Sequence, residues 1–161
     1  MNGWDILLKL AKVLLVGLLV VLLTTLIHGS TWHGDFKELR KRVESKLPLS
    51  DMQKGDEQLL RRLYGLNAGE LKHWILYTAQ DNMDVEELLL VEAAEEGQME
   101  LIRQAAEKRA ETQRNNFEGY GPEQLKLIEK YVLRESEPYV LFVISEDAEA
   151  VKAEFVKGLY R

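Results

Sequence analysis

The 161-residue sequence contains no cysteine, and this excludes several classes of protein. Without a thiol there can be no disulfide framework, zinc–thiolate site, cysteine nucleophile or lipid-modified cysteine. The signatures Gly-x-Ser-x-Gly and His-Glu-x-x-His are also missing, as is a phosphate-binding loop that ends in Gly-Lys-Ser/Thr. The sequence therefore singles out no catalytic residue, and we expect neither a cofactor nor an enzymatic activity.

The sequence also lacks an excess of positive charge. It has 21 Lys and Arg against 27 Asp and Glu, for a net charge of −6 at pH 7. A nucleic-acid-binding protein neutralises phosphates with clustered Lys and Arg, so nucleic acid is not an expected partner. The hydrophobic fraction of 46% is ordinary for a globular protein, and the length suits about one domain of roughly 100–200 residues.

Charge is nearly absent from residues 1–34, which we treat as a unit separate from residues 35–161. An apolar run begins at Ile6 and ends at Ile27. As a helix its 22 residues would be about 33 Å long, and a bilayer core is about 30 Å thick. This length predicts a transmembrane helix, with the lipid bilayer as partner. No Ala-x-Ala cleavage pattern follows, which favours an uncleaved signal anchor.

The orientation of this segment in a membrane follows from the flanking charges. Lys9, Lys12 and the terminal amine favour a cytoplasmic N-terminus, and hence an extracytoplasmic domain. Five basic residues after the run favour the opposite orientation: Lys37, Arg40, Lys41, Arg42 and Lys46. Because acidic residues are interleaved with them, we expect the domain to lie outside the cytoplasm. A cytoplasmic-facing membrane adaptor is the alternative.

Residues 35–161 show alternating helical and strand patterns. A capping box at Asp35 predicts one short helix, and Asp56 predicts a second, which Gly65 ends. Strands are expected at 73–78, 87–93, 130–134 and 139–145, and long helices over 97–116 and after Ser145. We therefore predict an α+β fold: a four-stranded antiparallel sheet with two long helices on one face (hairpin–helix, hairpin–helix), preceded by two short helices.

Two groups of side chains contain residue types that can bind metal ions, but neither matches the pattern of a known metal site. His28 and His33 could approach Asp35, but their spacing is not a known ligand pattern. The acidic hairpin lacks the glycine that a calcium loop needs for its bend, so we interpret it as a solvated turn; its members are Asp81, Asp84, Glu86 and Glu87. No metal site is expected.

A candidate surface platform lies at the end of the long helix. Three of its residues recur every four positions and so share one helix face, and two follow the helix; the five are Arg109, Gln113, Phe117, Tyr120 and Gln124. Together they could bind a peptide, glycan or partner domain. The alternative is that Phe117 and Tyr120 close the core while Arg109 and Gln113 fix the loop, because aromatic residues at helical spacing usually pack inward.

Three segments together resemble a bacterial family, the domain of unknown function numbered 4358, found mostly in Clostridia-type Firmicutes. They are Leu59-Leu-Arg-Arg-Leu-Tyr-Gly-Leu66, the series Arg109, Gln113, Phe117, Tyr120, Pro122 and Gln124, and Tyr139-Val-Leu-Phe-Val-Ile-Ser-Glu-Asp-Ala148. The resemblance covers roughly residues 35–160. It implies an extracytoplasmic domain tethered by a lipoprotein signal or a membrane helix. Since this chain has no cysteine, only the helix could anchor it. The family carries no established activity to transfer.

The sequence thus predicts a single-pass membrane protein with an extracytoplasmic domain of unknown function. We expect this domain to be a non-enzymatic binding or interaction module of the cell envelope, with an envelope protein or glycan as its partner. An alternative function, of a different class, is that of an envelope enzyme that hydrolyses peptidoglycan or peptide. A pocket holding two carboxylates, or a histidine with an oriented acid, would favour the enzyme.

Overall fold

The structure is a computed structural model that describes residues 4, 12–21 and 34–160. The chain divides into two compact units, Met1–Trp32 and His33–Arg161. In the first unit, residues 12–21 are helical. No helix among the described residues is long and apolar enough to cross a bilayer. The transmembrane helix predicted from Ile6 to Ile27 is therefore not supported, and its residues 6–11 and 22–27 lie outside the described part of the chain.

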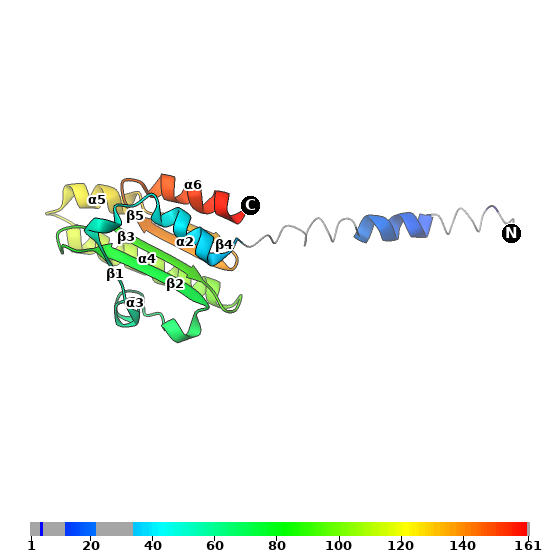
Figure 1. Cartoon of the computed structure of the whole chain (residues 1–161), viewed down its shortest axis with the longest axis horizontal. Helices are drawn as coiled ribbons and strands as arrows, with labels where there is room; N and C mark the ends of the chain where they lie inside the picture. The colour runs from blue at the N-terminus through cyan, green and yellow to red at the C-terminus, as the bar shows by residue number, and fades with distance from the viewer. Residues whose placement is uncertain (1–3, 5–11, 22–33, 161) are drawn as a thin grey trace. The chain divides into compact units, whose positions relative to one another are not determined.

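In residues 34–160, helices and strands follow one another largely as the sequence predicts (Figure 1). The α-helices are α2 (Phe36–Glu44), α3 (Glu57–Tyr64), α4 (Gln98–Phe117), α5 (Pro122–Glu129) and α6 (Ala148–Leu159). The strands are β1 (Met52–Lys54), β2 (His73–Ala79), β3 (Glu87–Glu92), β4 (Val132–Ser136) and β5 (Tyr139–Ile144). Short 3₁₀ turns lie at Leu49–Asp51 and Ala68–Glu70.

Capping fixes α3 at both ends. The Asp56 carboxylate accepts the backbone N–H of Leu59 at 2.8 Å, and Gly65 ends the helix with a φ of 69°, a conformation that glycine adopts without a Cβ penalty. The predicted capping box at Asp35 is wrong, because the Asp35 side chain makes no capping hydrogen bond to α2.

The sheet contains five antiparallel strands in the order β1-β2-β3-β5-β4. The prediction of four strands is therefore wrong. The missed strand is β1, which pairs Met52 with Ala79 and Lys54 with Tyr77. Its three residues are too few to show the alternation by which a strand is recognised in a sequence.

Helices cover both faces of the sheet (Figure 1). One core joins α2 and α6 to Ile75, Leu90 and Leu141, and the other joins α3, α4 and α5 to Leu89 and Phe142. The prediction that both long helices lie on one face is wrong, because α4 and α6 lie on opposite faces. The physical reason is that β3 and β5 are buried along their whole length, so apolar side chains on either face need a cover.

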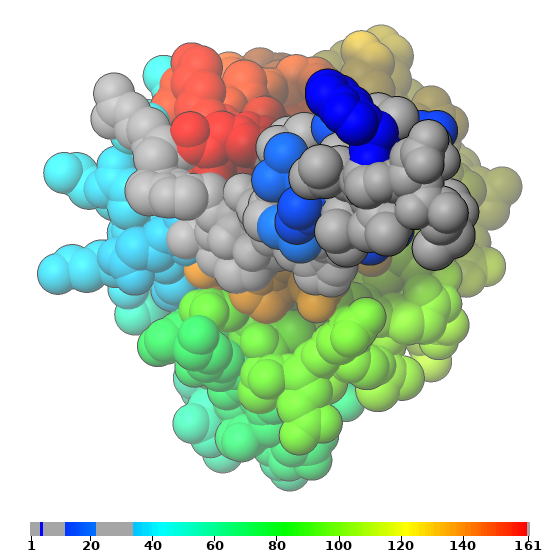
Figure 2. Space-filling view, turned by 90° about the vertical axis from the view of Figure 1, so that its right-hand side faces the viewer, coloured from blue at the N-terminus to red at the C-terminus, as the bar shows by residue number. Residues whose placement is uncertain are grey.

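The two ends of the sheet differ. At one end Gly34, where the described part of the domain begins, accepts a hydrogen bond from the Tyr139 hydroxyl. Figure 2 shows this end, with α2 (cyan) beside α6 (red). The other end carries the 80–86 loop between β2 and β3. The pairs His73–Glu92 and Thr78–Glu87 are five residues apart along the ladder, or about 17 Å. The chain thus enters the domain at one end, and the loop lies at the other.

Candidate functional site

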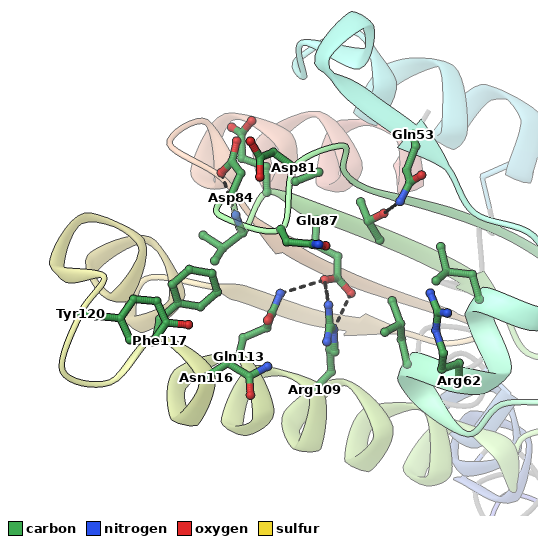
Figure 3. A pocket seen from close by; sticks show the side chains of 17 residues that line it. Gln53, Arg62, Asp81, Asp84, Glu87, Arg109, Gln113, Asn116, Phe117 and Tyr120 are labelled. Carbon is green, nitrogen blue, oxygen red and sulfur yellow. Dashed lines mark hydrogen bonds and ion pairs between the residues drawn. The ribbon is translucent and has the colours of Figure 1, made fainter.

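A cleft of about 380 Å³ lies at the loop end of the sheet (Figure 3). The end of β2 and the start of β3 form its floor, α3 and the second half of α4 form two walls, and the 80–86 loop forms a third. No Cys, Ser, Lys or His is among the described residues that line it. A second hollow of about 360 Å³ runs along β1 and α3, and shares Gln53, Leu59 and Arg62 with the cleft. The volume of the cleft falls in the range of small-ligand sites, about 300–1,000 Å³.

Glu87 on the floor is the most buried carboxylate of the cleft, with 1% of its surface exposed. Arg109 from α4 binds it through Nη2 at 2.7 Å and through Nε at 3.0 and 3.1 Å. The Tyr64 hydroxyl donates to the same carboxylate, and the Gln113 amide lies 3.5 Å from it. In Figure 3, Arg109 and Gln113 both point at Glu87. The network therefore joins α3, α4 and β3 around one neutralised charge.

The surroundings of this network raise the pKa values of two of its members, Tyr64 and Arg109. Burial, followed by the charge of Glu87, raises the pKa of Tyr64 well above its ordinary value, so the phenol stays protonated and donates. Burial alone would lower the pKa of Arg109, but hydrogen bonds and the charge of Glu87 outweigh it and raise that pKa. Glu87 thus acts as an internal counter-ion. Its sequence interpretation as part of a solvated turn is wrong.

The 80–86 loop carries the carboxylates that stay open to the cleft. Asp81 accepts the backbone N–H of Met83 at 2.9 Å, and Asp84 accepts that of Val85 at 2.7 Å, each through one oxygen. Glu86 accepts the Ser145 hydroxyl at 3.1 Å. Burial, together with the charge of Asp84 and two further acidic residues, raises the pKa of Glu86 above its ordinary value despite that hydrogen bond. The loop is therefore a locally negative wall.

Comparison with family models gives one match. Residues 45–145 match the model of the family described as Domain of unknown function (DUF4358). The chain belongs to this family. The match covers more than half of the 161 residues and confirms the resemblance stated from the sequence. No curated protein and no solved structure matches the chain significantly.

In this DUF4358 domain, four of the five predicted platform residues line the cleft. Arg109 and Gln113 bind Glu87, and Phe117 is buried, with 4% of its surface exposed. Tyr120 is 62% exposed, and its ring lies 5.6 Å from that of Phe117. Phe117 thus closes the core, as the alternative interpretation of the platform predicts, whereas Tyr120 lies at the rim of the cleft. That the platform binds a ligand stays a prediction.

The fifth platform residue, Gln124, does not line the cleft. Its side-chain amide donates to the backbone carbonyl of Met83 at 3.0 Å, which ties α5 to the 80–86 loop. The DUF4358 cleft also contains Arg62 and Asn116, which the sequence did not single out, and Glu87, which the sequence assigned to a solvated turn. The sequence did contain a signal that Glu87 is buried. Glu87 directly precedes the apolar run Leu88–Val91, and a strand with one face in water would alternate apolar and polar residues instead.

The histidine that the structure describes lies away from the cleft. His73 Nδ1 is 2.8 Å from the carboxylate of Glu92, which also accepts from Lys72 at 2.7 Å. The His73 ring stacks on Phe36, with a centroid distance of 5.2 Å. This pair is at the Gly34 end of the DUF4358 domain, and neither residue lines the cleft. His28 and His33 lie outside the described residues. Among the residues that the structure does describe, no three His, Asp or Glu side chains are grouped to hold a metal ion.

Proposed function

We infer that this DUF4358 protein is a membrane-attached, non-enzymatic binding module of the cell envelope, and that its ligand binds in the cleft beside the 80–86 loop. One observation carries the proposal: the cleft presents polar groups that the fold leaves available, above a floor whose charges already neutralise each other. Arg62 and Asn116 line it without a side-chain partner among the described residues. Concave sites with a few convergent polar groups are the usual places for ligands.

The described lining contains no His, Ser, Cys or Lys, and its deepest carboxylate is already paired, which supports a binding role rather than catalysis. General bases and nucleophiles in enzymes are most often His, Ser, Cys or Lys held by an oriented partner. The described lining contains none of these four residue types. Its deepest carboxylate, Glu87, is already paired with Arg109 and accepts a hydrogen bond from Tyr64.

Attachment to the membrane is supported by the composition of the N-terminal unit. The large apolar side chains described there are all more than half exposed, from 52% at Val20 to 78% at Trp4. An exposed apolar surface of this extent needs a cover, which lipid can supply. The domain is proposed to face outward, on the charge argument from Lys9 and Lys12. Fractionation of cells without detergent tests attachment, and recovery of the full-length chain in the supernatant would contradict it.

Reporter fusions after Arg161 test the orientation. A reporter that is active only outside the cytoplasm should give signal, and one that is active only inside should not. Signal from the inside reporter alone would establish the cytoplasmic-facing adaptor instead.

Binding through the cleft is tested with matched tyrosine variants. The full-length chain in detergent micelles is mixed with isolated cell envelope, and the fraction retained after washing is measured. Tyr120→Ala, at the rim, should lower retention severalfold, and the double variant with Asn116→Ala should lower it further. Tyr160→Ala is the control, because Tyr160 is 68% exposed, compared with 62% for Tyr120, and does not line the cleft. Equal retention of all variants would show that the cleft does not bind.

One observation favours the alternative of an envelope hydrolase. Glu86, whose pKa is raised, lines the cleft together with Asp84, and a pair of carboxylates can serve as acid and base. Incubation of the purified chain with peptidoglycan and peptides tests this alternative. Release of fragments by the wild type but not by Glu86→Gln would establish the hydrolase in place of the binding module.

A further inference from the structure

The cleft and the adjoining hollow along β1 form a trough with acidic residues at the 80–86 loop and two cations along the hollow. The two share Gln53, Leu59 and Arg62, so they are continuous. The 80–86 loop end carries Asp81 and Asp84, each of which accepts a hydrogen bond through only one carboxylate oxygen. The hollow is lined by two cations, Arg62 and Lys54, and by Asp56, whose carboxylate accepts the backbone N–H of Leu59. Neither cation has a carboxylate partner within the described part of the chain. In Figure 3, Arg62 and the two aspartates lie on opposite sides of Glu87.

Next to Glu87, the trough offers a hydrogen-bond acceptor on a largely buried side chain. Gln113 is 7% exposed, and its amide nitrogen faces Glu87. Gln113 lines the cleft, and its side-chain carbonyl oxygen accepts no hydrogen bond from another described residue. The oxygen is not among the buried atoms left without a partner, so it is open to solvent, and an N–H group of a ligand can donate to it. The amide of Asn116, one helical turn on, can both donate and accept.

Apolar side chains also line the trough, beside the acidic loop. The Tyr120 ring lies against Phe117, and Val85 and Leu63 line the same cleft. Met83 and Tyr120 are both exposed by more than half, at 61% and 62%. Exposed apolar groups beside polar ones suit a ligand that has side chains as well as hydrogen-bonding groups.

We propose that the trough binds a short peptide with free termini in an extended conformation. The ammonium group pairs with Asp81 and Asp84, the carboxylate pairs with Arg62, and a backbone N–H donates to the Gln113 carbonyl. This inference rests on the proposed function, because it names the ligand class of the same cleft. A polyanion would meet the acidic loop, and a purely apolar ligand would bury the Gln113 carbonyl without a donor.

The experiment uses the ¹⁵N-labelled full-length chain in detergent micelles and three tetrapeptide libraries. One library has free termini, the second is N-acetylated and the third is C-amidated. The side-chain amide signals of Gln113 and Asn116 report binding in the trough, and those of Asn115, which does not line it, are the reference. We expect the free library to shift the Gln113 and Asn116 signals, and each modification to weaken binding about tenfold, the effect of losing one charge-assisted contact.

Charge variants assign each terminus to its partner. Arg62→Gln should remove the penalty of C-amidation, and Asp81→Asn with Asp84→Asn should remove the penalty of N-acetylation while keeping an oxygen for the backbone N–H groups. Arg134→Gln is the control, because Arg134 is exposed on β4, the edge strand opposite β1. This variant should bind the three libraries as the wild type does.

The outcomes separate the ligand class from the binding role. Equal affinity for the three libraries would overturn the assignment of the termini. If no library shifts the Gln113 and Asn116 signals while envelope retention still depends on Tyr120, the ligand is not a peptide and the proposed function stands. If retention also fails to depend on Tyr120, both the peptide and the binding role are wrong.

Discussion

Arg109 and Glu87 are 22 residues apart in the sequence, yet they are joined by a two-pronged ion pair with a shortest distance of 2.7 Å, and the glutamate side chain is 1% exposed. The pair ties the middle of α4 to the first residue of β3. Removal of one partner from a buried pair leaves an uncompensated charge and costs far more than an exposed salt bridge. The cleft floor therefore depends on both residues together.

A double-mutant cycle measures this dependence. Arg109→Ala leaves the Glu87 carboxylate buried without its counter-ion and should lower the free energy of unfolding by about 3–5 kcal/mol. Glu87→Gln keeps an acceptor for Tyr64, and its loss should be smaller, at about 1–3 kcal/mol. Because Arg109→Ala loses much of its effect once Glu87 is neutral, the double variant should be more stable than the sum of the two losses predicts. Additive losses in denaturant unfolding would contradict the pairing.

The raised pKa of Glu86 predicts a pH-dependent stability. Its folded-state pKa lies above the ordinary value of 4.5, so between these two values the folded state binds more protons than the unfolded state. The wild type should therefore lose part of its stability as the pH rises from about 4.5 through the raised pKa. Glu86→Gln lacks this loss and should be the more stable protein at pH 7, with the difference vanishing below pH 4.5. Thermal unfolding of both proteins at several pH values tests this prediction. A stability difference between them that does not change with pH would contradict it.

Gly34 and α6 approach too closely for a side chain. A Cβ on Gly34 would lie 2.4 Å from the backbone carbonyl oxygen of Gly158, which no change of rotamer can relieve. Gly34→Ala should therefore lower the free energy of unfolding by about 1–3 kcal/mol, the usual cost of overpacking. Gly97→Ala is the control, since nothing lies within 4 Å of a Cβ there. Equal stability of the two variants would show that α2 and α6 separate at little cost.

The two predicted helix caps differ in the structure, which gives a matched comparison. Asp56→Ala removes the acceptor for Leu59 N–H and should cost about 0.5–2 kcal/mol of stability. Asp35→Ala should cost less, because the Asp35 side chain makes no capping hydrogen bond. Urea unfolding of both variants measures the difference. A larger loss for Asp35→Ala than for Asp56→Ala would contradict the assignment of these caps.

Local patterns in the sequence were sufficient for most elements. Strands β2, β3 and β5 lie within a residue or two of their predicted positions, because branched and aromatic runs bounded by turns define them without help from the rest of the chain. In α6, Val151 and Phe155 are four residues apart and both are buried, since helical spacing determines which residues share a face. The match to DUF4358 was likewise apparent from three local segments.

What the sequence by itself determined was therefore the type and place of most elements, since propensity, spacing and capping act within a few residues. Only the tertiary structure decided that β1 joins the sheet, that α4 and α6 cover opposite faces, and that Glu87 is an internal counter-ion rather than a solvated turn residue. Each of these depends on contacts between residues far apart in the chain. Whether a carboxylate is solvated or paired is set by which helix packs over it, and no local pattern encodes that choice.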